Sequence, residues 1–176
     1  MIKTKEQFYT QSCLPSCLAM LCGVKMTKKQ EGKILLKGLE KVNMTYAPGM
    51  LKAFVTIYKK KLNFFVENKY YAQNLKKFFS KNKYITLKNE KCDIEAIENK
   101  LIDGPIIAYV DAKFLEHDSY ADHAPHFIVL EKIHNGKVTI IDPWNGKRKD
   151  IKIKSLTGAI RSLKTRFKYS PVIITF

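Results

Sequence analysis

The sequence predicts a single α+β domain over residues 1–176, with helices in the first half and antiparallel strands in the second. Three observations support this class. Apolar residues recur at helical spacing in the first third of the chain, whereas compact β-type runs dominate after residue 104. The pair Asn135-Gly136 between two such runs is a strong hairpin signal. No repeat or low-complexity tract divides the 176 residues, and this length suits one hydrophobic core.

The helices are expected in the first half of the chain, and the first two have clear signals. Residues 13–22 place apolar side chains on one face, which is typical of an amphipathic helix. The capping box from Thr27 to Gln30 then opens a helix that ends at Gly38.

Three further helices and one strand are expected before residue 104. A helix follows Pro48, and its buried stripe is predicted to be Leu51, Phe54, Val55, Tyr58 and Leu62. Residues 63–70 are expected to form a short strand, and residues 72–80 a short helix. Asp93 caps the last of these helices, which ends at Asp103.

The strands of the second half complete the expected architecture. Residues 105–110 form a compact apolar run that is typical of a buried strand. Residues 126–133 and 138–141 flank the Asn135-Gly136 turn and are expected to pair as a hairpin. Residues 170–176 resemble a closing strand. We therefore expect N-terminal helices packed on a C-terminal antiparallel sheet.

Charge and hydropathy bear on the cellular location and the partners that we expect for the protein. No apolar run approaches the ~20 residues of a membrane-spanning helix, and the N-terminus lacks the apolar segment of a signal peptide. We therefore expect a cytoplasmic protein, or one delivered from the cytoplasm without a signal peptide. The net charge of +16 favours an anionic partner. Because most of the excess is lysine dispersed through expected helices, a solvated lysine-rich surface is the favoured interpretation.

The cysteines are expected to be free thiols, since disulfides are rare in reducing compartments. They are Cys13, Cys17, Cys22 and Cys92. Cys13 lies where a polar loop turns into a helix, and the unpaired N–H groups of a helix start favour a thiolate. A cysteine in such a position is nevertheless more often a small buried apolar residue. Its position alone does not make it a nucleophile.

A histidine and an aspartate are expected at one end of the predicted hairpin. His126 opens the first strand, and Asp142 ends the second. With a two-residue turn, the register would place His126 opposite Asn145. Asp142 would orient the imidazole while its Nε2 faces a thiol. The alternative is a surface histidine and an aspartate that serves the Asp142-Pro143 turn.

Four motifs in fixed order carry a resemblance to a known family. They are Gln7-x5-Cys13-x2-Ser16-Cys17-Leu18-x-Met20, Gly104-Pro105-Ile106-Ile107-Ala108, His126-Phe127-Ile128-Val129-Leu130 and Asp142-Pro143-x2-Gly146. In this order and spacing the chain resembles the bacteriocin-processing cysteine peptidases. In that family the peptidase domain precedes the membrane part of an exporter and cleaves its substrate after a double-glycine leader. Stand-alone relatives also exist. The resemblance implies a papain-like fold, and a stand-alone enzyme is expected because no transporter segment is attached.

The resemblance also implies a role for each matched residue. Cys13 matches the nucleophile, His126 the general base and Asp142 the acid that orients the histidine. Gln7 matches the glutamine whose side-chain amide joins a backbone N–H, that of Cys13, in binding the oxyanion.

The sequence departs from the family at two positions beside these residues, and it offers two weaker candidates. Leu14 replaces the glycine that usually follows the nucleophile, and Pro125 replaces the glycine that commonly precedes the histidine. Gln11 is a second possible oxyanion donor, although Gln7 has the family spacing. Cys17 is either a resolving thiol one helical turn beyond Cys13 or, as we favour, a packing residue.

Metal binding is not favoured by the sequence. The histidines His117, His123 and His126 with a cysteine could suggest zinc, but no CxxC or HExxH pattern supports such a site. Trp144 either walls the site or anchors its turn, and Asn145 is a second candidate for the orienting residue.

The function predicted from the sequence is a cysteine peptidase that hydrolyses a peptide or isopeptide bond. It requires no cofactor or metal, and small residues are expected before the scissile bond. One alternative is an acyltransferase or amidase that uses the same thioester chemistry. The other is a catalytically idle binding module whose basic surface holds an anionic partner.

Overall fold

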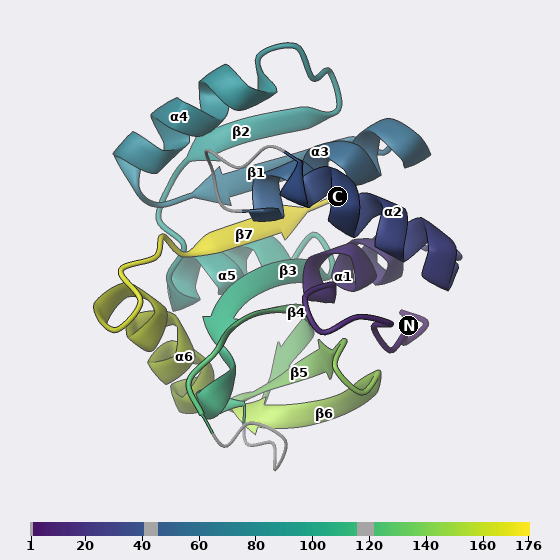
Figure 1. Cartoon of the computed structure of the whole chain (residues 1–176). Helices are drawn as coiled ribbons and strands as arrows, with labels where there is room; N and C mark the ends of the chain where they lie inside the picture. The colour runs from purple at the N-terminus through teal and green to yellow at the C-terminus, as the bar shows by residue number, and fades with distance from the viewer. Residues whose placement is uncertain (1, 41–45, 116–121) are drawn as a thin grey trace.

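One seven-stranded sheet organises the protein (Figure 1). The computed structural model describes residues 2–40, 46–115 and 122–176. The strands are β1 Leu62–Val66, β2 Ile85–Asn89, β3 Ile106–Asp111, β4 Pro125–His134, β5 Lys137–Asp142, β6 Lys147–Lys152 and β7 Val172–Thr175. Their order in the sheet is β2-β1-β7-β3-β4-β5-β6. β1 and β2 run parallel and the other neighbouring strands run antiparallel, so the sheet is mixed.

Helices cover both faces of this sheet. They are α1 Cys13–Leu21, α2 Lys28–Leu39, α3 Tyr46–Tyr58, α4 Lys69–Phe79, α5 Ile94–Leu101 and α6 Ile153–Thr165, with a short 3-10 turn at Ala112–Phe114. Ile107 of β3 packs with α1 to α4, whereas its neighbours Ile106 and Ala108 pack with α5 and α6. Because successive side chains of a strand point to opposite faces, a strand covered on both sides is apolar throughout. This explains the continuous apolar run of β3.

Several elements begin or turn at the residues where local sequence signals predict it. The side chain of Thr27 accepts a hydrogen bond from the backbone N–H of Gln30, and the backbone N–H of Thr27 donates to Oε1 of Gln30 over 2.8 Å. Asp93 caps α5 by accepting from the N–H of Ala96. The hairpin turn has positive φ at Asn135 and Gly136, 49° and 70°. This is the backbone that a two-residue turn between twisted strands requires, so the predicted hairpin is confirmed.

Other predictions of element type or extent are wrong. Leu62 belongs to β1 and not to the stripe of α3, and the strand expected at 63–70 ends at Val66. α4 begins earlier than expected, because the side chain of Asn68 accepts from the N–H of Tyr71 and caps it. The sheet also takes β1 and β2 from the first half of the chain, and β2, β6 and α6 were not predicted.

The architecture that results is an α+β domain, which fits a papain-like fold. The N-terminal segment lies against β4–β5–β6, where the N–H of Ile2 donates to the carboxylate of Glu131 on β4 over 3.2 Å. The N–H of Gln7 donates to the carbonyl of Pro143 over 2.7 Å. Within the described ranges, no helix combines the length and apolar character that crossing a membrane demands.

Candidate active site

The thiol of Cys13 occupies the start of α1. All residues from Cys13 to Met20 are buried, since α1 packs between the sheet and its neighbouring helices. Cys13 itself is 8% exposed and lines a pocket of about 480 Å³. The sulfur therefore lies beside a space that a ligand can enter. The first turn of a helix also leaves N–H groups directed toward it.

His126 and Asp142 are joined at one end of the hairpin. The Nε2 of His126 lies 2.8 Å from Oδ1 of Asp142, and both residues are buried. The same Oδ1 accepts from the backbone N–H of Trp144 over 2.9 Å. The carboxylate is thereby fixed relative to both the imidazole and the turn that follows β5.

The register of this hairpin differs from the predicted one by a residue. The ladder contains an irregularity between Leu130 and Lys132, and its last pair toward the site is Val129 with Ile141. Such a bulge inserts one extra residue on one strand. The alignment of His126 with Asn145 is therefore wrong. Asn145 instead accepts from the N–H of Lys147 within the turn between β5 and β6.

The orientation of the imidazole also differs from the expectation. Because Nε2 is engaged with Asp142, the ring nitrogen left for the thiol of Cys13 is Nδ1. The prediction that Nε2 faces the thiol is wrong. The hydrogen bond to Asp142 and the interaction with Cys13 both raise the pKa of His126, so the imidazole is coupled to both groups.

The electrostatics favour a thiolate and an imidazolium. Burial opposes ionisation of Cys13, but hydrogen bonding and charge from His126, together with the N–H groups of Phe127 and Leu14, lower its pKa below the usual value. Burial likewise opposes protonation of His126, but its hydrogen bonds to Asp142 and Cys13 raise its pKa to about 9. Each group thus stabilises the charged form of the other.

The pKa values of the other three thiols are raised, not lowered. Burial raises the pKa of Cys17 well above its ordinary value, and it raises those of Cys22 and Cys92 to about 12. The Sγ of Cys17 lies 3.3 Å from the carbonyl oxygen of Phe127, inside the core. All four cysteines are free. Only Cys13 among them combines burial with a lowered pKa.

Gln7 lies in the loop that leads to Cys13, and its amide is occupied within that loop. Its Nε2 donates to the carbonyls of Tyr9 over 2.8 Å and Thr10 over 3.0 Å. Its Oε1 is buried without a hydrogen-bond partner among the described residues. Both amide hydrogens are thus engaged, and donation to an oxyanion would require the release of one carbonyl. Gln11, the weaker candidate, is exposed.

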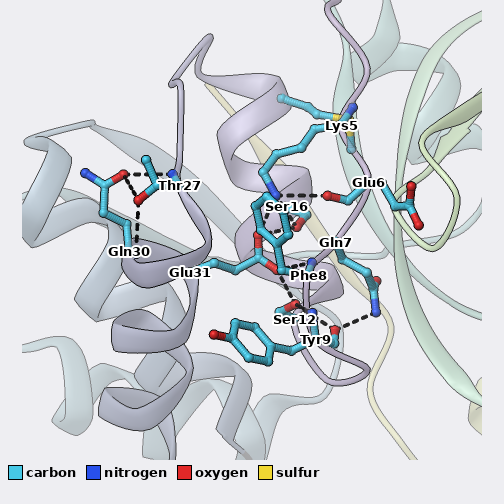
Figure 2. A network of polar contacts seen from close by, with 11 residues as sticks. Lys5, Glu6, Gln7, Phe8, Tyr9, Ser12, Ser16, Thr27, Gln30 and Glu31 are labelled. Carbon is cyan, nitrogen blue, oxygen red and sulfur yellow. Dashed lines mark hydrogen bonds and ion pairs between the residues drawn. The ribbon is translucent and has the colours of Figure 1, made fainter.

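A fully buried carboxylate, which the sequence did not reveal, holds this loop in place. Figure 2 shows Glu31 of α2 at the centre of the polar contacts. It accepts from the backbone N–H of Phe8 over 2.7 Å and from the hydroxyls of Ser12 and Ser16, and it pairs with the ammonium of Lys5. Phe8 follows Gln7 and Ser12 precedes Cys13. Glu31 therefore fixes both ends of the loop that connects Gln7 with Cys13.

The histidines considered for zinc do not gather into one site where they are described. His117 lies outside the described residues. The Nδ1 of His123 lies 2.6 Å from Asp111, whereas His126 is bonded to Asp142. Across residues 2–40, 46–115 and 122–176, no group of three or more metal-ligating side chains is placed to hold an ion.

Comparison with known proteins adds one finding. The model of the Peptidase C39 family matches residues 60–158, which is more than half of the chain. This range contains His126 and Asp142 and begins after Gln7 and Cys13. No curated protein matches the sequence.

Proposed function

Because the chain belongs to the Peptidase C39 family, we propose that it is a cysteine peptidase whose nucleophile is Cys13. In this proposal residues 1–176 act as one peptidase domain. His126 is the general acid and base, Asp142 orients it, and Gln7 contributes to the oxyanion site. The substrate is a peptide or protein, and the bond cleaved is a peptide or isopeptide bond.

The observation that carries the proposal is the hydrogen bond between Asp142 and His126, together with the coupling of His126 to Cys13, which lowers the pKa of that thiol. A thiol is a nucleophile only as the thiolate, so a lowered pKa is the property that this reaction needs. The imidazolium with a pKa of about 9 retains its proton at neutral pH. It can then give this proton to a leaving amine.

The reaction follows from these charges. The Cys13 thiolate attacks the carbonyl carbon, and the electron pair of the C=O bond moves to oxygen. When the tetrahedral species collapses, the C–N bond breaks and His126 protonates the departing amine. His126, now neutral, takes a proton from water as that water attacks the thioester. The C–S bond then breaks with its electron pair moving to sulfur, the acid product leaves, and the thiolate–imidazolium pair is restored.

The oxyanion is the charge that the loop before α1 must stabilise. The backbone N–H of Cys13 is at the start of the helix, and Gln7 lies a few residues before it. We propose that the Gln7 amide exchanges its bond to the carbonyl of Tyr9 or Thr10 for a bond to the oxyanion. This exchange involves no element of the sheet.

The test is cleavage of a peptide library derived from a digested proteome, with the products identified by mass spectrometry. The intact protein and its Cys22→Ser variant should produce the same new fragments, with oxygen from ¹⁸O-labelled water in their new carboxyl ends. The Cys13→Ser variant should produce none. Cys22 is the matched control, because it is 9% exposed against 8% for Cys13. Equal cleavage by Cys13→Ser would refute the assignment, and capture of the acyl group by an added amine would identify a transferase.

A further inference from the structure

Arginine is rare in this lysine-rich chain. Of the 32 lysine and arginine residues, three are arginine, and they stand at positions 148, 161 and 166. Arg148 forms an ion pair with Glu131 of β4. Arg161 and Arg166 instead both line one pocket of about 740 Å³ beside α6. A solvated lysine surface accounts for most of the +16 charge, but it does not explain why both remaining arginines line one pocket.

A buried carboxylate holds two other side chains that line this pocket. Asp111 is fully buried, and its Oδ2 lies 2.6 Å from Nδ1 of His123 and accepts from the hydroxyl of Ser162 over 2.6 Å. Its Oδ1 accepts from the backbone N–H groups of Lys113 and Ala124, each over 3.2 Å. The carboxylate is therefore fully engaged behind the pocket, and the ring nitrogen of His123 left to face the pocket is Nε2.

The charges around the pocket favour an anionic ligand. Arg161 and Arg166 are exposed, and none of the ion pairs formed by the described residues involves either of them. The described residues that line the pocket include no aspartate or glutamate. Asp122 precedes His123 but lies outside the lining. A guanidinium presents a planar fork of N–H donors that matches the two oxygens of a carboxylate, which an ammonium does not.

Two short stretches of chain connect this pocket with the one beside Cys13. His123 lines the pocket of the arginines, and Pro125 lines the pocket of Cys13. Arg166 and Lys168 are divided in the same way. Consecutive Cα atoms are about 3.8 Å apart, so the Cα atoms of each pair lie within about 7.6 Å of each other. Figure 1 shows α6 running into the segment that precedes β7. A peptide held at Cys13 therefore needs few residues to reach the arginines.

We propose that the pocket of Arg161 and Arg166 binds the carboxylate of an aspartate or glutamate in the substrate, within about six residues of the scissile bond. The inference rests on the proposed function, because it is Cys13 that makes the neighbouring pocket part of a peptidase site. It assigns the substrate as a peptide with an acidic residue near the cut, and it gives part of the positive charge a specific role.

The first test uses the same peptide library. Aspartate and glutamate should be enriched at one position within about six residues of the cut. A peptide with glutamate at that position should exceed its glutamine counterpart in kcat/KM by about 5- to 20-fold, as expected for exposed ion pairs with two arginines. The difference should lie in KM, because a contact remote from the reacting atoms binds substrate and transition state alike. The double variant Arg161→Gln and Arg166→Gln should abolish it.

The matched control is the double variant Lys76→Gln and Lys77→Gln. It also removes two exposed positive charges near the end of a helix, but these lie on α4 and outside the pocket lining. It should leave the difference between the glutamate and glutamine peptides intact. Equal loss in both double variants would show a general effect of charge and overturn the inference. Cleavage by the intact protein without any acidic preference would overturn it as well.

A binding measurement tests the pocket apart from catalysis. The probe is a fluorescein-labelled hexapeptide that alternates glutamate and glycine, followed by fluorescence anisotropy with the Cys13→Ala protein. It should bind about 5- to 20-fold more tightly than its glutamine counterpart, and the arginine double variant in this background should remove the difference. Equal binding of the two peptides would overturn the inference. Glutamate-dependent binding without any cleavage by the intact protein would refute the proposed function and leave the arginine site intact.

Discussion

Removal of the Glu31 carboxylate is expected to destabilise the protein strongly. The side chain is fully buried, as are its partners Ser12 and Ser16. The Glu31→Ala variant would leave the hydroxyl of Ser16 and the backbone N–H of Phe8 without this acceptor, at about 1–3 kcal/mol for each group that stays unpaired, whereas the hydroxyl of Ser12 keeps the carbonyl of Tyr9. It would also leave the ammonium of Lys5 without its partner, although that side chain is 17% exposed and can gain water. Because the hydroxyls can turn to other acceptors, we expect a total loss of about 3–5 kcal/mol.

The assay is urea unfolding followed by circular dichroism, with the free energy of unfolding extrapolated to water. Glu95→Ala is the matched control, because Glu95 is also a glutamate in the first turn of a helix but is exposed. It measures the interaction with the helix dipole, about 0.3–1 kcal/mol. A loss for Glu31→Ala no larger than that for Glu95→Ala would refute the assignment of Glu31 as the residue that fixes the loop.

Three further substitutions test the neighbours of the thiol. Asp142→Asn removes the strongest interaction that raises the pKa of His126, so the alkaline limb of the activity profile should move below pH 9; an unchanged limb would contradict the pairing. Gln7→Ala should lower kcat/KM by about 10²- to 10³-fold while the alkylation rate of Cys13 stays constant, and an equal fall of both would show that the loop, not the oxyanion, is affected. Gly146→Ala places a Cβ 3.0 Å from the backbone nitrogen of Glu6 at a φ of +63°, whereas Gly136→Ala has a similar φ of +70° but open space. Both variants should lose about 1–2 kcal/mol of unfolding free energy because alanine must adopt a left-handed backbone, and urea unfolding should show a further loss for Gly146→Ala alone. Equal losses would show that the contact with Glu6 is unimportant.

Local signals in the sequence were sufficient for much of the fold. The capping box of α2 and the Asn135-Gly136 turn involve residues within three positions of one another, so tertiary structure is not needed to read them. β6 was missed because its sequence, KRKDIK, is polar, as edge strands commonly are. The parallel pairing of β1 with β2 depends on the path of α4 between them, which no short pattern reveals.

The sequence indicated which residues are candidates for the site, but it did not predict how they are arranged. The hairpin turn alone indicated that His126 and Asp142 share one end of the ladder. The bulge near Leu130 has no sequence signature here, and it shifted the register by one residue. Glu31 lies in the first turn of α2, where an acid is common, so nothing in the local sequence sets it apart. Its burial arises only when the N-terminal segment folds back over α1 and α2.

The state of the Cys13 thiol is measured most directly by its alkylation with iodoacetamide as a function of pH, with each modified cysteine mapped by mass spectrometry. At neutral pH, Cys13 should react well before Cys17, Cys22 and Cys92, because its pKa is lowered while theirs are raised. In the His126→Ala variant this advantage should disappear, and Cys13 should react only as the pH rises to about 9 or above. Equal labelling of Cys13 and Cys22 at neutral pH, or an advantage of Cys13 that survives His126→Ala, would contradict the thiolate–imidazolium pair.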